Sequence, residues 1–253
     1  MGVKIGLDLG STAIKAVIVN DDEAVWRGGM PTAPEQARRA RSLIDRGFGE
    51  LGLGASTPFG LASTGYGKNL YPGADLTLDE LSANARGLFK LSGGEARAAV
   101  NIGGQDLKVM RLTEAGRVAD FRMNDKCAAG TGRFFELAAR LLDAPLEDFY
   151  RISLEPGPET ELSSTCVVFA ETEIVSLLAG GATRGSIVRA LHASVSRRAA
   201  GLLGPVEGSV WLDGGPAMNR GLVEALADEL LTEVRVVAEP QYTVAYGAAL
   251  SLV

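Results

Sequence analysis

Two runs of alternating apolar positions flank a short glycine turn near the start of the chain. The first run is Val3, Ile5, Leu7 and Leu9, the turn is Gly10-Ser11-Thr12, and the second run is Ile14, Ala16 and Ile18. Such alternation is typical of a strand with one buried face. Residues 3–19 are therefore predicted to form a strand, a tight turn and a second strand.

The same pattern returns 93 positions later, where residues 100–104 align with 7–11 and Leu107-Lys108 aligns with Ile14-Lys15. A repeated unit of this size predicts two related lobes, each with a hairpin loop. We expect an N-terminal lobe over residues 1–94, completed by a helix within 240–253, and a C-terminal lobe over 95–239. Two facing hairpin loops can hold a polyphosphate between them.

The remaining elements follow from helical spacing, short apolar runs and turn residues. Helices are predicted over residues 35–51, 79–91, 131–142, 170–178, 186–203, 222–231 and 245–250, and further strands over 59–63 and from 210 to a glycine turn at 214–215. The fold class is therefore α/β.

Composition narrows the class of protein. A chain of 253 residues exceeds the usual single domain, and its 46% apolar residues are ordinary for a folded protein with a core. The net charge of −6 argues against nonspecific nucleic-acid binding, which needs a basic surface. With no secretion signal and no apolar run approaching ~18 residues, we expect a cytoplasmic protein that does not bind membranes.

The first turn carries the pattern Asp8-x-Gly10-Ser11-Thr12-x-x-Lys15. Glycine lets backbone N–H groups approach a phosphate, the hydroxyls add donors, Asp8 can hold a water bound to Mg²⁺, and Lys15 can offset phosphate charge. Taken alone, the pattern fits a plain β-hairpin equally well. Gly214 and Gly215, which follow a strand, would let a flat nucleoside lie against the backbone.

The chain has two cysteines, Cys127 and Cys166, each shortly before a helix-like segment. The positive end of a helix favours a thiolate, as in metal or redox sites. A small buried apolar role is the alternative, although the polar residues 124–126 and the glycines around Cys127 suggest a turn. Two cysteines in so long a chain do not make a disulfide scaffold. The single histidine, His192, excludes a His-rich metal site and is interpreted as helix packing or surface.

Together these motifs resemble a known group of proteins. Residues 8–12, 101–106 and 213–215 resemble the two phosphate loops and the adenosine loop of the actin, sugar-kinase and Hsp70 ATPase superfamily. More narrowly, NIGGQD at 101–106, MNDKCAAGTG at 123–132 and SSTCVVFAE at 163–171 resemble the activator ATPases of 2-hydroxyacyl-CoA dehydratases. These form the BadF/BadG/BcrA/BcrD-type family, which is related to the ATP-binding subunits of benzoyl-CoA reductases. The resemblance runs from residue 3 to 252.

The resemblance implies a two-lobed α/β fold of duplicated ribonuclease H-like lobes with ATP in the interlobe cleft. It also implies a homodimer with one [4Fe-4S] cluster at the subunit interface, which passes single electrons from ferredoxin or flavodoxin to a CoA-ester dehydratase or reductase component. The residue count agrees, because such a cluster is usually held by four thiolates and each chain supplies Cys127 and Cys166.

The resemblance further assigns residues to ATP or ADP and Mg²⁺. The expected nucleotide-binding residues are Gly10, Ser11, Thr12, Ala13, Ile14, Lys15, Gly103, Gly104, Gln105, Gly214, Gly215, Pro216, Ala217, Asn219 and Gln241. Relatives often have Asp where this chain has Asn101, so Asp8 with Gln105 or Asp106 is expected to perform the catalytic work. Asn84 stands where relatives often carry His.

Three other interpretations stay open. A small-molecule kinase would use the same ATP loops but leave the two cysteine motifs unexplained, and an actin-like polymer subunit would form filaments. Four cysteines across a dimer could also hold Zn²⁺, which accepts tetrahedral thiolates.

Overall fold

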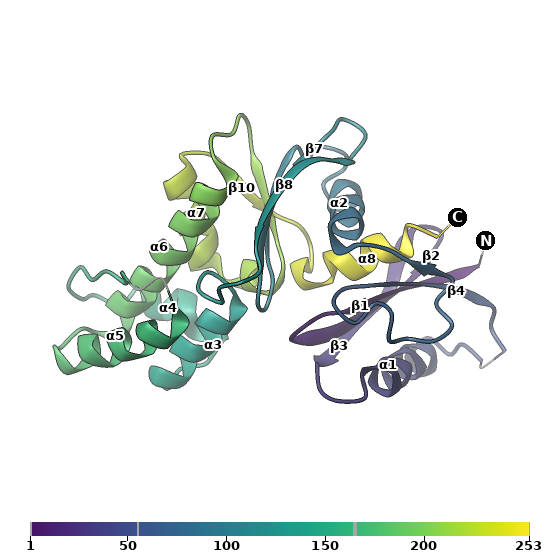
Figure 1. The fold of residues 1–253 in the computed structure, drawn as a ribbon, viewed down its shortest axis with the longest axis horizontal. Helices are drawn as coiled ribbons and strands as arrows, with labels where there is room; N and C mark the ends of the chain where they lie inside the picture. Colours follow the sequence, from purple (N-terminus) through teal and green to yellow (C-terminus); the bar gives the residue numbers. More distant parts are fainter. Residues whose placement is uncertain (1, 55, 164–165, 253) are drawn as a thin grey trace. The chain divides into compact units, whose positions relative to one another are not determined.

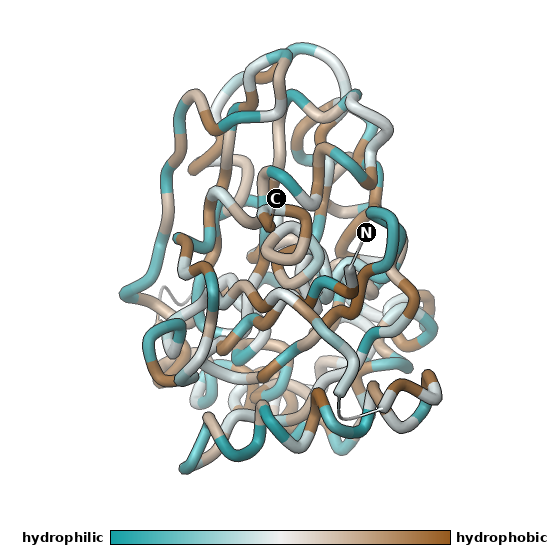
Figure 2. The backbone as a smooth tube through the Cα atoms, turned by 90° about the vertical axis from the view of Figure 1, so that its right-hand side faces the viewer, coloured by the Kyte–Doolittle hydropathy of each residue, from teal (hydrophilic) through white to brown (hydrophobic). Residues whose placement is uncertain are grey.

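The computed structural model describes residues 2–54, 56–163 and 166–252. The chain divides into two compact units, shown in the ribbon of Figure 1. The first unit comprises Met1–Ala96, Leu112–Ala119 and Gln241–Val253, and the second comprises Arg97–Arg111 and Asp120–Pro240. Two five-stranded sheets form the framework of the fold. Along the backbone, apolar (brown) and polar (teal) stretches alternate in Figure 2.

The sheet of the first unit has the order β3-β2-β1-β4-β5. Its strands are β1 (Val3–Leu9), β2 (Ala13–Asn20), β3 (Glu23–Pro31), β4 (Phe59–Thr64) and β5 (Leu76–Thr77). The first three strands form antiparallel neighbours, whereas β4 runs parallel to β1 and β5 runs parallel to β4. The strand, turn and strand predicted for residues 3–19 are confirmed.

Helices cover both faces of this sheet. The predicted inward positions of β1 and β2, among them Leu7 and Ile14, pack with Leu43 of α1 (Gln36–Glu50). Val17 and Val19 point to the other face and pack with α8 (Thr243–Ala249). The helix α2 (Glu80–Leu91), capped by the Asp79 carboxylate, lies against α8. Burial on both faces explains the continuous apolar run of residues 16–19 in β2.

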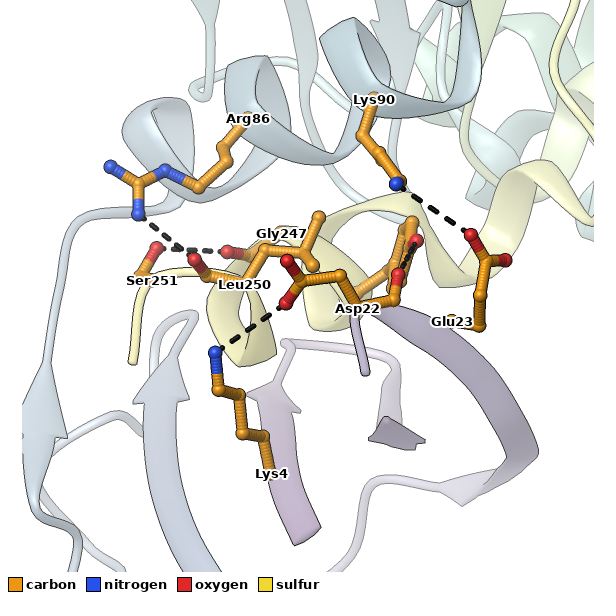
Figure 3. Close-up of polar contacts among 9 residues, drawn as sticks. Lys4, Asp22, Glu23, Arg86, Lys90, Gly247, Leu250 and Ser251 are labelled. Carbon is orange, nitrogen blue, oxygen red and sulfur yellow. Dashed lines mark hydrogen bonds and ion pairs between the residues drawn. The ribbon is translucent and has the colours of Figure 1, made fainter. Parts of the chain in front are cut away.

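The C-terminal segment is held in the first unit by polar contacts (Figure 3). The Arg86 guanidinium donates to the Leu250 carbonyl at 3.0 Å, and the Tyr246 hydroxyl donates to the Asp22 carbonyl at 2.6 Å. Nearby, Lys4 pairs with Asp22 and Lys90 pairs with Glu23. The last helix of the chain therefore completes a unit that begins with the first strand.

The second unit repeats the topology of the first. Its sheet has the order β10-β9-β6-β7-β8, with β6 (Ala98–Ile102), β7 (Leu107–Leu112), β8 (Val118–Asn124), β9 (Val210–Asp213) and β10 (Val234–Val236). The pairs follow the same pattern, since β6 is antiparallel to β7 and parallel to β9, and β9 is parallel to β10. The duplicated α/β fold predicted from the sequence is confirmed.

Five α-helices belong to the second unit within the described residues: α3 (Gly132–Leu141), α4 (Phe149–Ser153), α5 (Val167–Ala179), α6 (Arg184–Leu203) and α7 (Arg220–Leu230). Short 3₁₀ turns lie at Leu146–Asp148, Gly215–Met218 and Pro240–Tyr242. The helix expected to begin at residue 170 begins at Val167, and β3, β5, β8, β10 and α4 were not predicted. In the part of the chain that the structure describes, no helix is both long and apolar enough to cross a membrane.

The only histidine is buried in the second unit. His192 on α6 is 3% exposed, and its Nε2 lies 3.0 Å from Nδ2 of Asn219. Asn219 caps α7, because its Oδ1 accepts from the N–H groups of Gly221 and Leu222. The amide nitrogen must therefore donate to His192, which places the imidazole proton on Nδ1. Burial lowers the pKa of His192 to about 4 from the ordinary 6.5.

Close packing of α2 on α8 generates the first prediction. A Cβ atom on Gly247 would lie 1.8 Å from the Ala83 carbonyl oxygen and 2.6 Å from the Gly87 nitrogen, both backbone atoms. We expect Gly247→Ala to lower the free energy of unfolding by ~1–3 kcal/mol, measured by urea denaturation, because the helices must separate. Gly49→Ala is the matched control, since a Cβ there meets nothing within 4 Å; it should stabilise by ~0.5–1 kcal/mol. A Gly247→Ala variant as stable as the control would contradict this packing.

The buried histidine generates a second prediction, on pH. Unfolded His192 binds a proton below its ordinary pKa of 6.5, whereas the folded side chain stays neutral down to about 4. The unfolded state takes up more protons in this window, so stability falls as the pH falls. Between pH 7 and pH 4.5 the wild type should lose about 2–3 kcal/mol more than His192→Gln. Equal slopes of unfolding free energy against pH in the two proteins would refute this.

Candidate functional site

The first hairpin loop, residues 10–12 between β1 and β2, is fixed by its own backbone. The Gly10 N–H donates to the Ala13 carbonyl at 3.1 Å, and the Thr32 hydroxyl donates to the Gly10 carbonyl at 2.7 Å. The Thr32 N–H donates to the Thr12 carbonyl at 2.9 Å. The residues expected to bind phosphate, Gly10 to Lys15, thus lie in one ordered hairpin.

Asp8 lies beside this loop with an unsatisfied oxygen. Its Oδ2 pairs with Lys15 Nζ at 2.9 Å, and the residue is 2% exposed. Its Oδ1 is buried and has no hydrogen-bond partner among the described residues, and neither does the hydroxyl of Thr64. Register places Asp8 opposite Lys15 on β2 and opposite Thr64 on β4. A buried carboxylate oxygen without a donor is costly, which favours a ligand such as a metal-bound water at this position.

The second hairpin loop, residues 103–106, has the same closure. The Gly103 N–H donates to the Asp106 carbonyl at 2.9 Å. Asp106 is paired with Lys108 at 2.8 Å, and both side chains are nearly buried, whereas Gln105 is exposed. The negative charge of Asp106 is therefore offset within the hairpin. Of the two residues predicted to be catalytic on this hairpin, Gln105 and Asp106, only Gln105 is exposed to solvent.

The carbonyl groups of this loop are bonded to the start of α3. The Gly132 N–H donates to the Gly103 carbonyl at 2.9 Å, and the Arg133 N–H donates to the Gly104 carbonyl at 2.9 Å. The first amides of a helix otherwise lack intrahelical partners. The segment that precedes α3 carries Cys127, so two hydrogen bonds join the predicted phosphate loop to the helix that follows the cysteine.

The predicted adenosine loop follows β9. Gly214 has φ 93°, and a Cβ there would lie 2.1 Å from the Ile102 carbonyl oxygen, so only glycine fits. Gly215, Pro216 and Ala217 form the 3₁₀ turn, and Asn219 caps α7. Gln241 lies in the 3₁₀ turn Pro240–Tyr242, and its Oε1 is buried without a hydrogen-bond partner among the residues that the structure describes.

The sequence motif placed Asp213 in the adenosine loop but gave no partner for its side chain. Asp213 ends β9 in register with Asn101 on β6, and its Oδ1 accepts a hydrogen bond from Asn101 Nδ2 at 2.8 Å. Asp213 is fully buried and Asn101 is 4% exposed. The quoted motif Asp213-Gly214-Gly215 contained the residue, but only the register across the sheet shows its partner.

Both cysteines lie in the second unit and are half-buried, and neither forms a disulfide. Cys166 is the N-cap residue of α5, while Cys127 packs against the core five residues before α3. The Cys127 N–H donates a hydrogen bond to Asn124 Oδ1 at 3.2 Å. Ser164 and Thr165 of the predicted cysteine motif lie outside the described residues. Among the residues with a described position, no group of three or more His, Cys, Asp and Glu side chains could hold a metal ion.

Comparison with known proteins agrees with this geometry. Residues 5–251 match the BadF/BadG/BcrA/BcrD ATPase family. The activator of lactoyl-CoA dehydratase from Anaerotignum propionicum is 40% identical over 248 residues, which cover 97% of this chain and 95% of that protein. The solved structure of the activator of the 2-hydroxyisocaproyl-CoA dehydratase from Clostridium difficile, with bound ADPNP, is 39% identical. It superimposes with a TM-score of 0.91 and covers 98% of this chain and 93% of its own.

A more distant likeness concerns the fold alone. A ROK family glucokinase from Streptomyces griseus, in complex with glucose and AMPPNP, is 14% identical and covers 98% of both chains with a TM-score of 0.56. The sugar-kinase-like fold expected from the loops is thus confirmed. Because the family pattern spans nearly the whole chain, the chain belongs to the BadF/BadG/BcrA/BcrD ATPase family and is an ATPase.

Proposed function

We propose that this ATPase is an activator that couples ATP hydrolysis to the delivery of single electrons to a CoA-ester dehydratase or reductase component. The observation that carries the proposal is the pair Cys127 and Cys166, two reduced thiols in one unit, one of them at a helix N-terminus. The relatives named above are activators of CoA-ester dehydratases. Ferredoxin or flavodoxin is the proposed electron donor, and the cytoplasm is the proposed location.

The thiols fit a [4Fe-4S] cluster only when two chains combine. Such a cluster needs four soft ligands, and the two cysteines of one chain are half of that number. The described residues of a single chain hold no larger ligand group. A two-fold homodimer, in which Cys127 and Cys166 of each chain meet their copies, completes the set. When bound, the cluster accepts and releases one electron at a time.

A surface beside Cys166 supports the homodimer. On α5, Val168 is 71% exposed, Phe169 is 68% exposed and Val175 is 51% exposed. Val168 and Val175 are seven residues apart and lie on one face of the helix. Exposed apolar residues gathered on one helix mark an interaction surface. A second copy of this chain is the occupant that would cover this surface and also supply the missing thiolates.

The hairpin loops supply the proposed nucleotide contacts. Residues 10–15 and Gly103, Gly104 and Gln105 bind phosphate, and the loop from Gly214 to Asn219 with Gln241 binds adenosine. Asp8 holds a water of Mg²⁺ through Oδ1, which lacks a hydrogen-bond partner among the described residues, while Lys15 orients the other oxygen. Gln105, exposed on the second hairpin, orients the attacking water.

The bonds between the second hairpin and α3 support coupling of the nucleotide to the cysteines. When Gly103 and Gly104 shift on loss of the γ-phosphate, the amides of Gly132 and Arg133 shift with them, because they donate hydrogen bonds to these two carbonyl groups. Ordering of loops by a γ-phosphate and their release on hydrolysis is a known device in nucleotide switches. The segment with Cys127 would move with α3, so its exposure depends on the nucleotide.

Three alternatives remain distinguishable by experiment. A small-molecule kinase shares the fold but leaves the cysteines and the apolar face of α5 without a role. An actin-like subunit would polymerise on addition of ATP. A Zn²⁺ bridge uses the same four thiolates; elemental analysis of protein purified without oxygen separates it from an iron cluster.

Replacement of either cysteine should remove the cluster from the whole dimer. We expect about four irons per wild-type dimer after reconstitution with iron and sulfide, and almost none in Cys127→Ala or Cys166→Ala. Thr160→Ala, in the loop before Cys166, serves as the control and should keep the iron. Binding of ADP, measured by calorimetry, should stay within about twofold in all variants, because the nucleotide residues are separate. Full iron content in either cysteine variant, or zinc in place of iron, would sink the proposal.

A charge on the apolar face of α5 should separate the dimer. Val175→Asp places a carboxylate in the proposed interface, where its desolvation opposes association. Analytical ultracentrifugation should show a dimer for the wild type and a monomer, or a dimer weakened at least ~100-fold, for Val175→Asp, which corresponds to about 3 kcal/mol. Leu231→Asp introduces the same charge at the C-cap residue that follows α7, which is 92% exposed, and this variant should stay dimeric. Equal association of both variants would rule out α5 as the interface.

A further inference from the structure

The ends of four strands carry different polar residues in the two units. In the first unit, Asp8 of β1 lies opposite Thr64 of β4. In the second unit, Asn101 of β6 lies opposite Asp213 of β9. Each pair comprises one residue on the central strand and one on its parallel neighbour.

The positions are equivalent by three independent features. Asp8 faces Lys15 across its hairpin, as Asn101 faces Lys108 across the other. Both outer positions precede a glycine with positive φ, 86° at Gly65 and 93° at Gly214. A Cβ on either glycine would strike the backbone of the last residue of the central strand, Leu9 in one unit and Ile102 in the other. Asn101 therefore occupies the place of Asp8, and Asp213 occupies the place of Thr64.

The first unit therefore carries its carboxylate, Asp8, on the central strand β1, whereas the second unit carries Asp213 on β9, the parallel neighbour of its central strand. Asn101, the amide at the position equivalent to Asp8, donates a hydrogen bond from Nδ2 to Asp213 Oδ1 at 2.8 Å. A carboxylate can only accept, so Asn101 must donate with its nitrogen. This fixes the amide orientation, and the amide oxygen of Asn101 is the atom turned away from Asp213.

Asp106 does not replace the missing acid. Its carboxylate lies 2.8 Å from Lys108 Nζ, with 9% of the Asp106 side chain and 2% of the Lys108 side chain exposed. Asp106 also lies in the turn between β6 and β7, so it does not occupy the strand-end position of Asp8. Asp213 is fully buried, and its Oδ1 accepts the hydrogen bond from Asn101.

We propose that Asp213 is a positioning residue for ATP hydrolysis. In the first unit the carboxylate of Asp8 acts directly, whereas in the second unit the carboxylate of Asp213 acts through the amide of Asn101, to which it is hydrogen-bonded. Asp213 holds the Asn101 amide so that its oxygen accepts a proton from a water at the second hairpin, either the attacking water or a water of Mg²⁺. A hydrogen bond to a charged acceptor polarises the amide and strengthens its oxygen as an acceptor. The inference rests on the proposed binding of the phosphates by the hairpin loops.

The test exchanges the two residues. In Asp213→Asn the two amides can still bond to each other, so the fold is kept while the charge is lost. We expect its kcat for ATP hydrolysis to fall on the order of tenfold or more, with ADP affinity within about twofold and a higher Mg²⁺ concentration for half-maximal rate. The exchanged variant Asn101→Asp with Asp213→Asn restores one carboxylate and one amide, and should recover kcat to within about threefold of wild type. The matched control Asp228→Asn, an exposed acid on α7, should leave kcat and Mg²⁺ dependence unchanged.

Two results would overturn the proposal: wild-type kcat and Mg²⁺ dependence in Asp213→Asn, or an exchanged variant no more active than Asp213→Asn. If Asp213→Asn fails to fold, judged by thermal unfolding, the exchanged variant still decides, because it preserves the composition of the pair. These assays need neither cluster nor partner enzyme, so loss of the electron-transfer proposal would not affect them. Asp8→Asn tests the proposed phosphate site separately. An unchanged ATPase rate in this variant would refute the binding of phosphate at the hairpin loops, on which the role of Asp213 depends.

Discussion

Two backbone hydrogen bonds connect the second hairpin loop to the start of α3, the helix that follows the segment with Cys127. The carbonyl groups of Gly103 and Gly104 accept from the first amides of α3, which otherwise would have no helical partner. The loop is itself closed by the bond between Gly103 and Asp106, so it cannot shift without changing either its own turn or the start of α3. Backbone bonds of this kind depend on no side chain. The connection is therefore a property of the fold rather than of any one residue's chemistry.

The sequence predicted those parts of the structure whose signal is local. Alternation along β1 and β2 directs Leu7 and Ile14 to one face, and the structure confirms both strands. The strand β8 was missed because most of its residues, Phe121 and Arg122 among them, are exposed, so no apolar period marks it. The start of α5 was placed three residues late because Val168 and Phe169 are apolar yet exposed, and apolar spacing there does not report burial.

The candidate site residues were likewise predicted where their signal is local in the sequence and missed where it is not. Gly10, Gly103 and Gly214 were found from the sequence because turns need glycine at definite positions. The bond between Asn101 and Asp213 was not found, since 112 residues separate the two and only the register of parallel strands brings them together. The environment of Asp8 could not be predicted either: one oxygen pairs with Lys15, and the other has no hydrogen-bond partner in the described part of the chain.

The discontinuous first unit has a consequence for synthesis on the ribosome. Its sheet needs α8, which packs on Val17 and Val19 through residues near the C-terminus of the chain. The second unit ends at Pro240, before that helix has been made. Its contacts therefore close first, although its residues are translated after most of the first unit. Until α8 has been synthesised, Val17 and Val19 lack their apolar cover, so this face of the first sheet stays exposed on the nascent chain.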